Sequence, residues 1–363
     1  MNWHYFIFVW IAVMAFFSST VNVYYPTDEF GKTVYRWKFV YALVSFWPVI
    51  YLVAFTMPRY DSVLYMSIYR NLPTTVSGLS YVLSATESGK GWTVFEWIVK
   101  VVFGGSETAF RVVLVAFHSI PVLYLLRKYS DDFLISLYLF LANSCHMAWM
   151  MNGLRQYLAV SLILAGTSLI LKKKYVPLIA VILLASTIHT SALIMIPIVF
   201  IAQGEAWNGK TLLFILGAII MTYLFSRNTG LLDMMLTGTE YSGMMANSIL
   251  LGDDGVNPLR VLVYCVPVVL AFIGKDILRE EGDQVMNLCV NMSIITAGLY
   301  LIAMVTSGIM IGRLPIYTSI YSFILLPTMI RKIFTEQTAK LVTVAMVILF
   351  FIYYLYENGA VNI

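Results

Sequence analysis

The sequence predicts an all-α protein, a polytopic transmembrane helical bundle of about 11–12 membrane segments. Three observations support this prediction. First, 60% of the 363 residues are hydrophobic and only 12% are charged, whereas roughly 25% of the residues in an average soluble domain are charged. Second, apolar runs of near-spanning length recur along the chain. Third, Lys and Arg cluster in alternate connections, as in proteins that thread a bilayer.

The apolar runs place the membrane segments one by one. The first run lacks the basic residues that precede the apolar core of a signal peptide, so it predicts a transmembrane helix. No charged or low-complexity stretch is long enough for a second domain, and we expect one transmembrane domain over residues 1–363. The net charge of +4 resides mostly in short connections, which argues against a nucleic-acid partner. The runs are 3–21, 37–57, 108–126, 133–151, 154–171, 211–226, 259–274, 285–307, 314–330 and 341–356.

The basic connections predict the orientation of the chain. Cytoplasmic loops of membrane proteins are enriched in Lys and Arg, and this rule puts both chain ends on the outer side. The connections assigned to the cytoplasm contain Lys32, Arg36 and Lys38; Arg127 and Lys128; Lys172, Lys173 and Lys174; Lys275 and Arg279; and Arg331, Lys332 and Lys340.

The apolar segment 175–202 would break this pattern if it were one long helix, because the later basic loops would then lie outside. Two half-spans that turn back near residues 187–190 restore the rule throughout. A backbone turn at membrane depth is tolerated where it is buried in protein or lines a wet cavity. The sequence therefore predicts a hairpin of half-spans, with His189 at its tip and facing the outer side.

Two long connections also fall on the outer side. Residues 58–107 contain an amphipathic stretch, 92–103, that is too short to span and is expected to lie in the membrane interface. Within it, Glu96 and Lys100 are four residues apart, the spacing of a helical ion pair. Residues 227–258 are rich in Gly, Met, Asp and Thr and are expected to form a cap.

Polar residues from separate parts of the chain converge on the predicted outer side. Ionisable residues are costly in a membrane domain and therefore point to function. Arginine suits phosphate because its planar guanidinium stays charged and donates two parallel hydrogen bonds. Arg155 and Arg313 lie in short turns and could together bind a diphosphate; otherwise each simply extends its charge to the membrane surface. The converging residues are Arg59 and Asp61; Asn152, Arg155 and Gln156; His189; Arg260; and Arg313.

Two residues are candidates for a catalytic base. His189 is a base or phosphate ligand if it faces outward from its apolar segment, and a packing residue if it does not. Asp61 is either a carboxylate base whose pKa a lipid-shielded site raises, or the surface ion-pair partner of Arg59.

Two further histidines lie within apolar runs. Arg111 and His118 share one helical face and form either a polar stripe along a cavity or a packing contact. His146 is expected to pack between helices. The sequence contains neither a glycine-rich phosphate motif nor a carboxylate triplet, so we expect a metal-independent protein without a cofactor.

Three stretches resemble a known family. They are NGLRQYLAVSLILAG (152–166), KKKYVPLIAVILLASTIHTSALI (172–194) and IGRLPIY (311–317). Their order and spacing resemble the EpsG-like family of Wzy-type bacterial polysaccharide polymerases, and the resemblance covers most of the chain from about residue 58 onward. The Asn-Gly-x-Arg-Gln element, followed by His-x-Ser-Ala, is its most specific part.

The resemblance carries over to single residues. Arg155, Gln156, His189 and Arg313 match polar positions of the family, and Asp61 with Tyr65 matches the Asp-to-Tyr spacing of its first outer loop. The sequence departs from the family directly before that Asp, where it reads Pro-Arg-Tyr and the family usually has Gly nearby.

The resemblance also implies a fold and an activity. Members of the family are similar to lipid-linked-sugar glycosyltransferases of the GT-C class, which work at the outer face of the bacterial inner membrane. It implies an enzyme that joins undecaprenyl-diphosphate-linked oligosaccharide repeats into O-antigen, capsule or exopolysaccharide. Its partners would be the lipid-linked oligosaccharide and membrane lipids, with room for a chain-length regulator. An O-antigen ligase, a membrane acyltransferase and a non-enzymatic flippase or transporter remain as alternatives.

Overall fold

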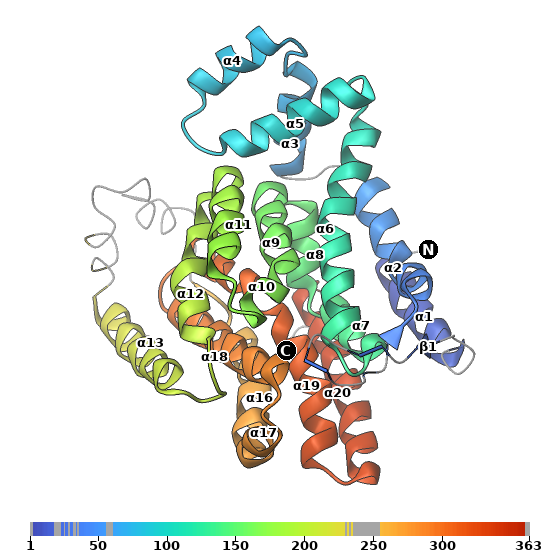
Figure 1. Ribbon diagram of the computed structural model, residues 1–363, viewed down its shortest axis with the longest axis vertical. Coiled ribbons are helices and arrows are strands. Elements are labelled where there is room, and N and C mark those ends of the chain that lie inside the picture. Colours follow the sequence, from blue (N-terminus) through green and yellow to red (C-terminus); the bar gives the residue numbers. More distant parts are fainter. Residues whose placement is uncertain are drawn as a thin grey trace. The chain divides into compact units, whose positions relative to one another are not determined.

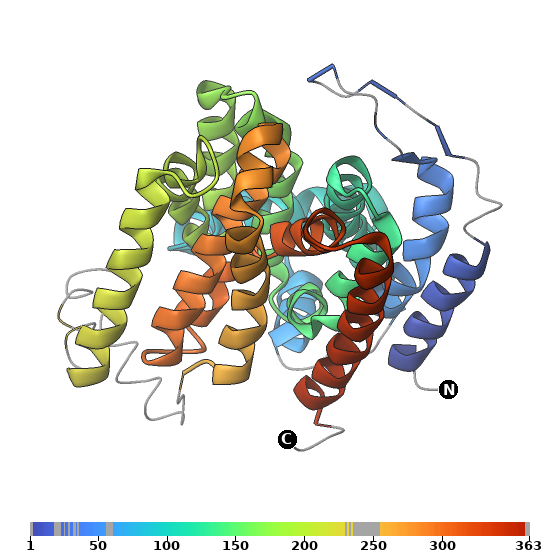
Figure 2. The ribbon, with the colours of Figure 1, turned by 90° about the horizontal axis from the view of Figure 1, so that it is seen from below.

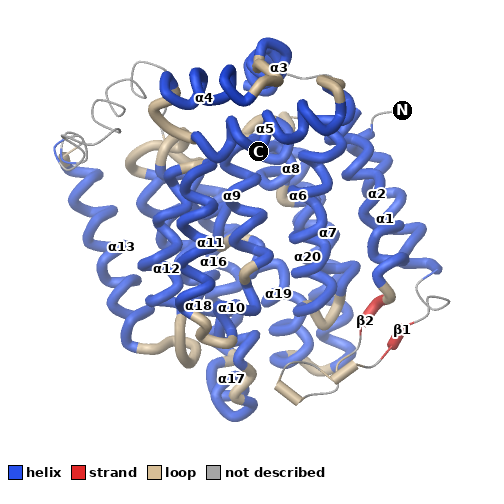
Figure 3. The backbone as a smooth tube through the Cα atoms, turned by 45° about the horizontal axis from the view of Figure 1, so that its top comes forward, coloured by secondary structure: helices blue, strands red, loops and turns tan. Residues whose placement is uncertain are grey.

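The computed structural model describes residues 3–17, 23–24, 26–27, 30–31, 34, 36–55, 61–228, 231, 234 and 255–359. Helices form nearly all of the regular secondary structure in these ranges (Figure 3). The strands among them are a short antiparallel pair, β1 (Val23–Tyr24) and β2 (Arg36–Trp37), in which Val23 lies opposite Trp37. The predicted all-α class is confirmed.

Four helices in the described residues are long and apolar enough to cross a membrane, and the number rises to six if each of two bent helix pairs is one span. A polytopic helical membrane protein is thereby confirmed. The predicted total of about 11–12 segments also counts shorter apolar helices of 10–17 residues, and that total stays a prediction. The four long helices are α6 (Glu107–Tyr129), α13 (Gly209–Arg227), α18 (Gln284–Met304) and α20 (Glu336–Glu357).

One of the two bent pairs divides the predicted run 133–151, and the other joins the helix of run 259–274 to a short helix in the basic connection that follows it. α7 (Phe133–Ala142) and α8 (Ser144–Met151) meet at 67°. Asn143 stands between them with φ −88° and ψ 90°, outside the helical region, and short polar side chains of this kind compete with helical hydrogen bonding. α16 (Pro258–Ile273) and α17 (Lys275–Glu281) meet at 64°.

The chain clusters into two compact units. Unit 1 comprises Met1–Leu193 with Thr343–Ile363, and unit 2 comprises Ile194–Val342. The expectation of one transmembrane domain stays a prediction. Besides α6, α7 and α8, unit 1 contains α1 (Trp3–Phe16), α2 (Phe39–Phe55), α3 (Asp61–Asn71), α4 (Val76–Ala85), α5 (Lys90–Phe103), α9 (Leu154–Ala165), α10 (Thr167–Leu171) and α11 (Tyr175–Ile188).

Helices α6, α9 and α11 form the centre of unit 1. α6 packs against α2 and α9, and α11 packs against α9. The end of α20 belongs to the same unit, where the Tyr138 hydroxyl donates to the carbonyl oxygen of Val347 at 2.6 Å. α9 and α10 divide the predicted run 154–171 at Gly166, whose N–H donates to Ile163 at 2.9 Å.

Helices α3, α4 and α5 lie together at the N-terminal end of α6 (Figure 1). The predicted helix at 92–103 is therefore confirmed as α5, but the predicted loop around it is also helical from Asp61 onward. Polar end signals explain this difference. Asp61 stands in the first turn of α3, where the helix dipole favours an acid, and Thr75 caps α4 by accepting from Gly78 N–H at 3.2 Å.

Segment 175–202 forms two short helices, as predicted. α11 ends at Ile188, and His189 follows with an extended backbone, φ −148° and ψ 117°. The 3-10 helix η2 (Thr190–Ile194) and then α12 (Met195–Ala202) continue the chain. The interruption near residues 187–190 is confirmed, whereas the reversal of direction stays a prediction.

Unit 2 is built around α18. This helix packs against α12, α13, α16, α19 (Ile320–Ile333) and the 3-10 helix η3 (Ile311–Tyr317), and Figure 2 shows α13, α18 and α16 side by side. Gly298 permits the close contact with α13, because a Cβ there would lie 3.0 Å from Cζ of Phe214. The predicted cap at 227–258 falls mostly outside the described residues.

Candidate functional site

The start of α9 carries Arg155, the arginine of the motif that most resembles the known family. Its side chain is partly buried and lies against the turn before α5. Nη2 donates a long hydrogen bond of 3.5 Å to the carbonyl oxygen of Ser88. The next residue, Gly89, has φ +76°, and a Cβ there would lie only 2.7 Å from Cζ of Arg155. The position of the guanidinium therefore depends on a glycine that is far away in sequence.

The neighbouring Gln156 connects α9 to His189. Gln156 is 3% exposed, and its Nε2 donates to Oγ of Ser191 at 3.5 Å. The same hydroxyl lies 2.7 Å from Nδ1 of His189. The backbone also fixes His189, since its N–H donates to Ala185 and its carbonyl accepts from Ala192, both at 3.0 Å. The imidazole is therefore held in a defined place after α11.

The same end of α11 touches α5. A Cβ at Gly91 would lie 3.0 Å from the carbonyl carbon of Thr187. Three segments thus meet within unit 1, and we call them the α5–α9–α11 junction: residues 88–92, 154–156 and 187–191. The junction brings together a guanidinium, an amide and an imidazole, which are groups suited to binding an oxyanion and accepting a proton.

A buried carboxyl lies on α5, one helical turn beyond the junction. Glu96 is 1% exposed, and neither of its carboxylate oxygens accepts a hydrogen bond from the residues that the structure describes. Burial raises the pKa of Glu96 to about 8, although the neighbouring Trp92 indole and the charge of Arg155 lower it. Burial has this effect because a low-dielectric environment disfavours the charged form of an acid.

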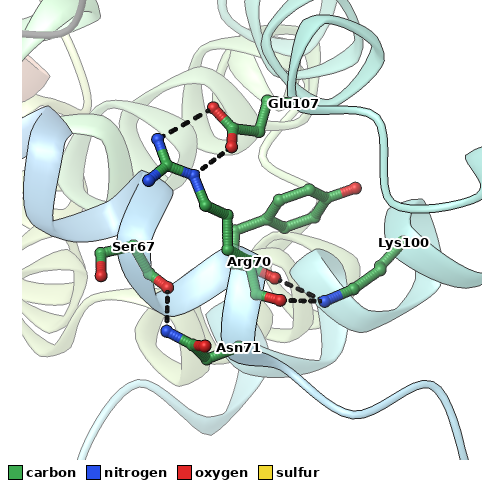
Figure 4. Close-up of polar contacts among 6 residues, drawn as sticks. Ser67, Arg70, Asn71, Lys100 and Glu107 are labelled. Atoms are coloured by element: carbon green, nitrogen blue, oxygen red, sulfur yellow. Dashed lines mark hydrogen bonds and ion pairs between the residues drawn. The ribbon is translucent and has the colours of Figure 1, made fainter.

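The expected ion pair between Glu96 and Lys100 does not form. Nζ of Lys100 instead donates to the carbonyl oxygens of Tyr69 and Arg70, at 2.8 and 2.7 Å (Figure 4). A cation there satisfies the last carbonyls of α3 and complements the negative end of its dipole. Arg70 pairs in turn with Glu107 at the start of α6. Lys100 therefore serves to attach α3 to α5.

The other residues predicted for the site in unit 1 occupy less central positions. Asp61 is exposed at the start of α3. Tyr65 follows one turn later and lies edge-on to Trp92 of α5, with ring centroids 5.5 Å apart. Asn152 ends α8, where its N–H donates to Ala148 at 2.9 Å. Tyr65 is thus linked to the junction through Trp92, and Asp61 shares its helix.

The remaining arginines of the predicted site do not belong to the described part of unit 1. Arg260 and Arg313 belong to unit 2, at the end where α16 begins and α18 ends. A Cβ at Gly312 would lie 2.7 Å from Cγ2 of Val256, so η3 and the start of α16 are neighbours. Arg59 lies outside the described residues. The joint action of Arg155 and Arg313 stays a prediction.

The two histidines of the apolar runs are packing residues. His118 is fully buried, and its ring lies 5.1 Å from that of Tyr157. His146 is also fully buried, with Nδ1 3.2 Å from the Tyr157 hydroxyl. The packing interpretation of His146 is confirmed, and of the two interpretations of His118 the structure favours packing.

Fold and site together define a polytopic α-helical membrane protein whose polar site lies where three helices of unit 1 meet. The model of the EpsG family matches residues 39–362, nearly the whole sequence, so the chain belongs to the EpsG family. Neither a curated protein nor a solved structure matches it. The family points to a polymerase-type enzyme of polysaccharide biosynthesis that acts on a lipid-linked polysaccharide substrate.

Proposed function

We propose that this protein is a membrane glycosyltransferase that joins undecaprenyl-diphosphate-linked oligosaccharide repeats into a long surface polysaccharide, at the outer face of the bacterial inner membrane. Membership of the EpsG family supports the reaction class. The observation that carries the proposal is the α5–α9–α11 junction. There Arg155 contacts the turn before α5, and the next residue, Gln156, is connected through Ser191 to His189.

The proposed reaction is a displacement at an anomeric carbon. A hydroxyl of one lipid-linked repeat attacks the anomeric carbon of the growing glycan. The new bond joins that carbon to the hydroxyl oxygen, and the bond between the carbon and the diphosphate oxygen breaks. The electron pair leaves with the lipid diphosphate, and the hydroxyl proton passes to a base on the protein.

Arg155 would bind the diphosphate. A guanidinium can donate two parallel hydrogen bonds to phosphate oxygens and offset the charge that develops on the leaving group. Its present contact with the Ser88 carbonyl is long, so an anion could replace that contact at small cost. Binding of the same diphosphate by Arg313, Arg260 and Arg59 stays a prediction from the sequence.

His189 would be the base. Its hydrogen bond with Ser191 orients the ring, and a neutral imidazole accepts protons near neutral pH. Asp61 is the alternative base, one turn from Tyr65 on α3. Gln156, Asn152 and Tyr65 would support the site and the acceptor sugar.

The proposed orientation has support within unit 1. α6 begins beside α3 and α5 and ends with Arg127 and Lys128. Lys172, Lys173 and Lys174 likewise follow α10 and precede α11, whose opposite end reaches the junction. Because basic ends of membrane helices favour the cytoplasm, the junction would face outward.

Glycan length distinguishes this proposal from its alternatives. A strain that lacks the gene should accumulate single lipid-linked repeats. A ligase defect would instead leave long chains unattached to lipid A core, and a flippase defect would leave no glycan outside. A membrane acyltransferase defect would change acyl groups and leave chain length intact. Full-length attached polymer in the deletion strain would refute the proposal.

A further inference from the structure

Glu96 is a buried acid that the proposed reaction does not use. It is 1% exposed, and both of its carboxylate oxygens lack a hydrogen-bond partner among the described residues. A buried charged group without a partner is strongly unfavourable, so such a group is either neutral or held beside an opposite charge. Glu96 can meet either condition, because its carboxyl can be protonated and Arg155 provides an opposite charge. Its protonation can therefore change when the surroundings of Arg155 change.

Arg155 is the cation whose charge acts on Glu96, and it lowers the pKa of that carboxyl. Two other basic residues nearby have partners of their own: Lys100 donates to the carbonyls at the end of α3, and Arg70 pairs with Glu107. The elements that contact α5 carry the following charged or titratable groups: Asp61, Tyr65, Tyr69 and Arg70 of α3; Tyr81 of α4; Glu107, Arg111, His118, Tyr124, Arg127, Lys128 and Tyr129 of α6; and Tyr175 of α11. α9 adds Arg155, which touches the turn before α5, and Tyr157, and α5 itself carries Lys90 and Lys100.

The charge of Glu96 also acts on Tyr69 of α3. Burial raises the pKa of the Tyr69 hydroxyl, and the charges of Glu96 and Glu107 raise it further. Tyr69 therefore stays neutral whenever Glu96 titrates. Among the described groups that act on Glu96, Arg155 is the one that an anionic ligand can bind.

We propose that Glu96 is a positioning residue that competes with the diphosphate for Arg155: the ionised carboxylate attracts the guanidinium, and the protonated carboxyl leaves it available. This inference rests on the proposed function only in taking the anion to be a diphosphate. A diphosphate on Arg155 neutralises the field that favours ionised Glu96. Binding of the anion is then accompanied by uptake of a proton from solvent, and release of the lipid diphosphate by loss of that proton.

The coupling has a defined sign. Below pH 8 Glu96 is mainly protonated and Arg155 is available, so affinity for a diphosphate is highest there. Above pH 8 the carboxylate competes, and each further pH unit reduces the affinity by up to about tenfold. Affinity should therefore fall about tenfold between pH 7 and pH 9.

Binding of farnesyl diphosphate to the purified full-length protein tests the inference. Wild type should lose about tenfold in affinity between pH 7 and pH 9. Glu96→Gln, which mimics the neutral carboxyl, should bind as tightly as wild type at pH 7 and stay tight at pH 9. Glu107→Gln is the matched control, because Glu107 is paired with Arg70, and it should keep the wild-type pH dependence.

Equal pH dependence in wild type and Glu96→Gln would overturn the inference, as would a folded Glu96→Gln that fails to bind at pH 7. Calorimetry on wild type alone gives a second measurement: titrations at pH 8 in buffers of different ionisation enthalpy should reveal proton uptake, and none would overturn it. The two proposals can fail separately. Proton-linked binding without polymerisation would refute only the polymerase, and polymerisation with pH-independent binding would refute only the role of Glu96.

Discussion

Substitution of Gly89 tests whether the turn before α5 positions Arg155. Gly89 has φ +76°, and a Cβ there would lie 2.7 Å from Cζ of Arg155. An ordinary contact is about 3.5 Å, so the guanidinium must move by roughly 1 Å in Gly89→Ala. A misplacement of about 1 Å can cost up to about 100-fold in rate. We expect polymerisation to fall 10- to 100-fold, which corresponds to about 1.4–2.7 kcal/mol.

Gly104→Ala is the matched control for Gly89→Ala. Gly104 ends the same helix with φ +66°, but a Cβ there would meet nothing within 4 Å. A side chain in the left-handed region costs roughly 1–2 kcal/mol, so both variants should lose similar stability. Conversion of lipid-linked repeats to polymer, compared with thermal unfolding in the same detergent, separates the two effects. Equal loss of activity in both variants would show that backbone strain, and not the place of Arg155, is responsible.

Three further changes address other parts of unit 1. Lys100→Met should destabilise the protein by about 1–2 kcal/mol, because it removes two hydrogen bonds to the end of α3. The control Lys90→Met changes an exposed lysine of the same helix and should leave the unfolding temperature unchanged. Equal shifts in the two variants would refute the role of Lys100 in attaching α3 to α5. Because burial raises the pKa of Glu96 from its ordinary value of 4.5 to about 8, the stability of the fold decreases as pH rises through this window. Wild type should therefore unfold at lower temperature at pH 8 than at pH 5, and Glu96→Gln should show a smaller difference; an equal difference would contradict the burial argument. His189→Gln should reduce turnover about 10²- to 10⁴-fold, the range for loss of a general base, while Asp61→Asn should have little effect; the reverse result would identify Asp61 as the base.

The sequence was sufficient for much of the fold. Apolar runs predicted the membrane helices because a spanning helix must be long and apolar. The interruption at His189 was also predictable, since the positive-inside rule conflicted with one long helix over 175–202. The bend between α7 and α8 was not predicted, because its cause is local: Asn143 leaves the helical region inside an otherwise continuous apolar run.

The candidate site was less predictable than the fold. The contact between Gly89 and Arg155 joins residues far apart in sequence, and no local pattern indicates it. Glu96 did carry a usable signal. Its spacing from Trp92 and Val99 puts all three on one helical face, and that face is buried. The four-residue spacing between Glu96 and Lys100 suggested a helical ion pair instead. That spacing does not reveal which face of α5 is covered by other helices.

Polymerisation by the purified protein tests the central claim most directly. Wild type, Arg155→Lys and the control Arg70→Lys would be reconstituted in liposomes with defined lipid-linked repeats, and the products separated by length on a gel. Wild type and Arg70→Lys should give a series of long products, because Arg70 pairs with Glu107 at an exposed position. Arg155→Lys should give single repeats, since lysine keeps the charge but cannot donate the two parallel hydrogen bonds of a guanidinium. Wild-type activity in Arg155→Lys, or no long products from wild type, would contradict the account.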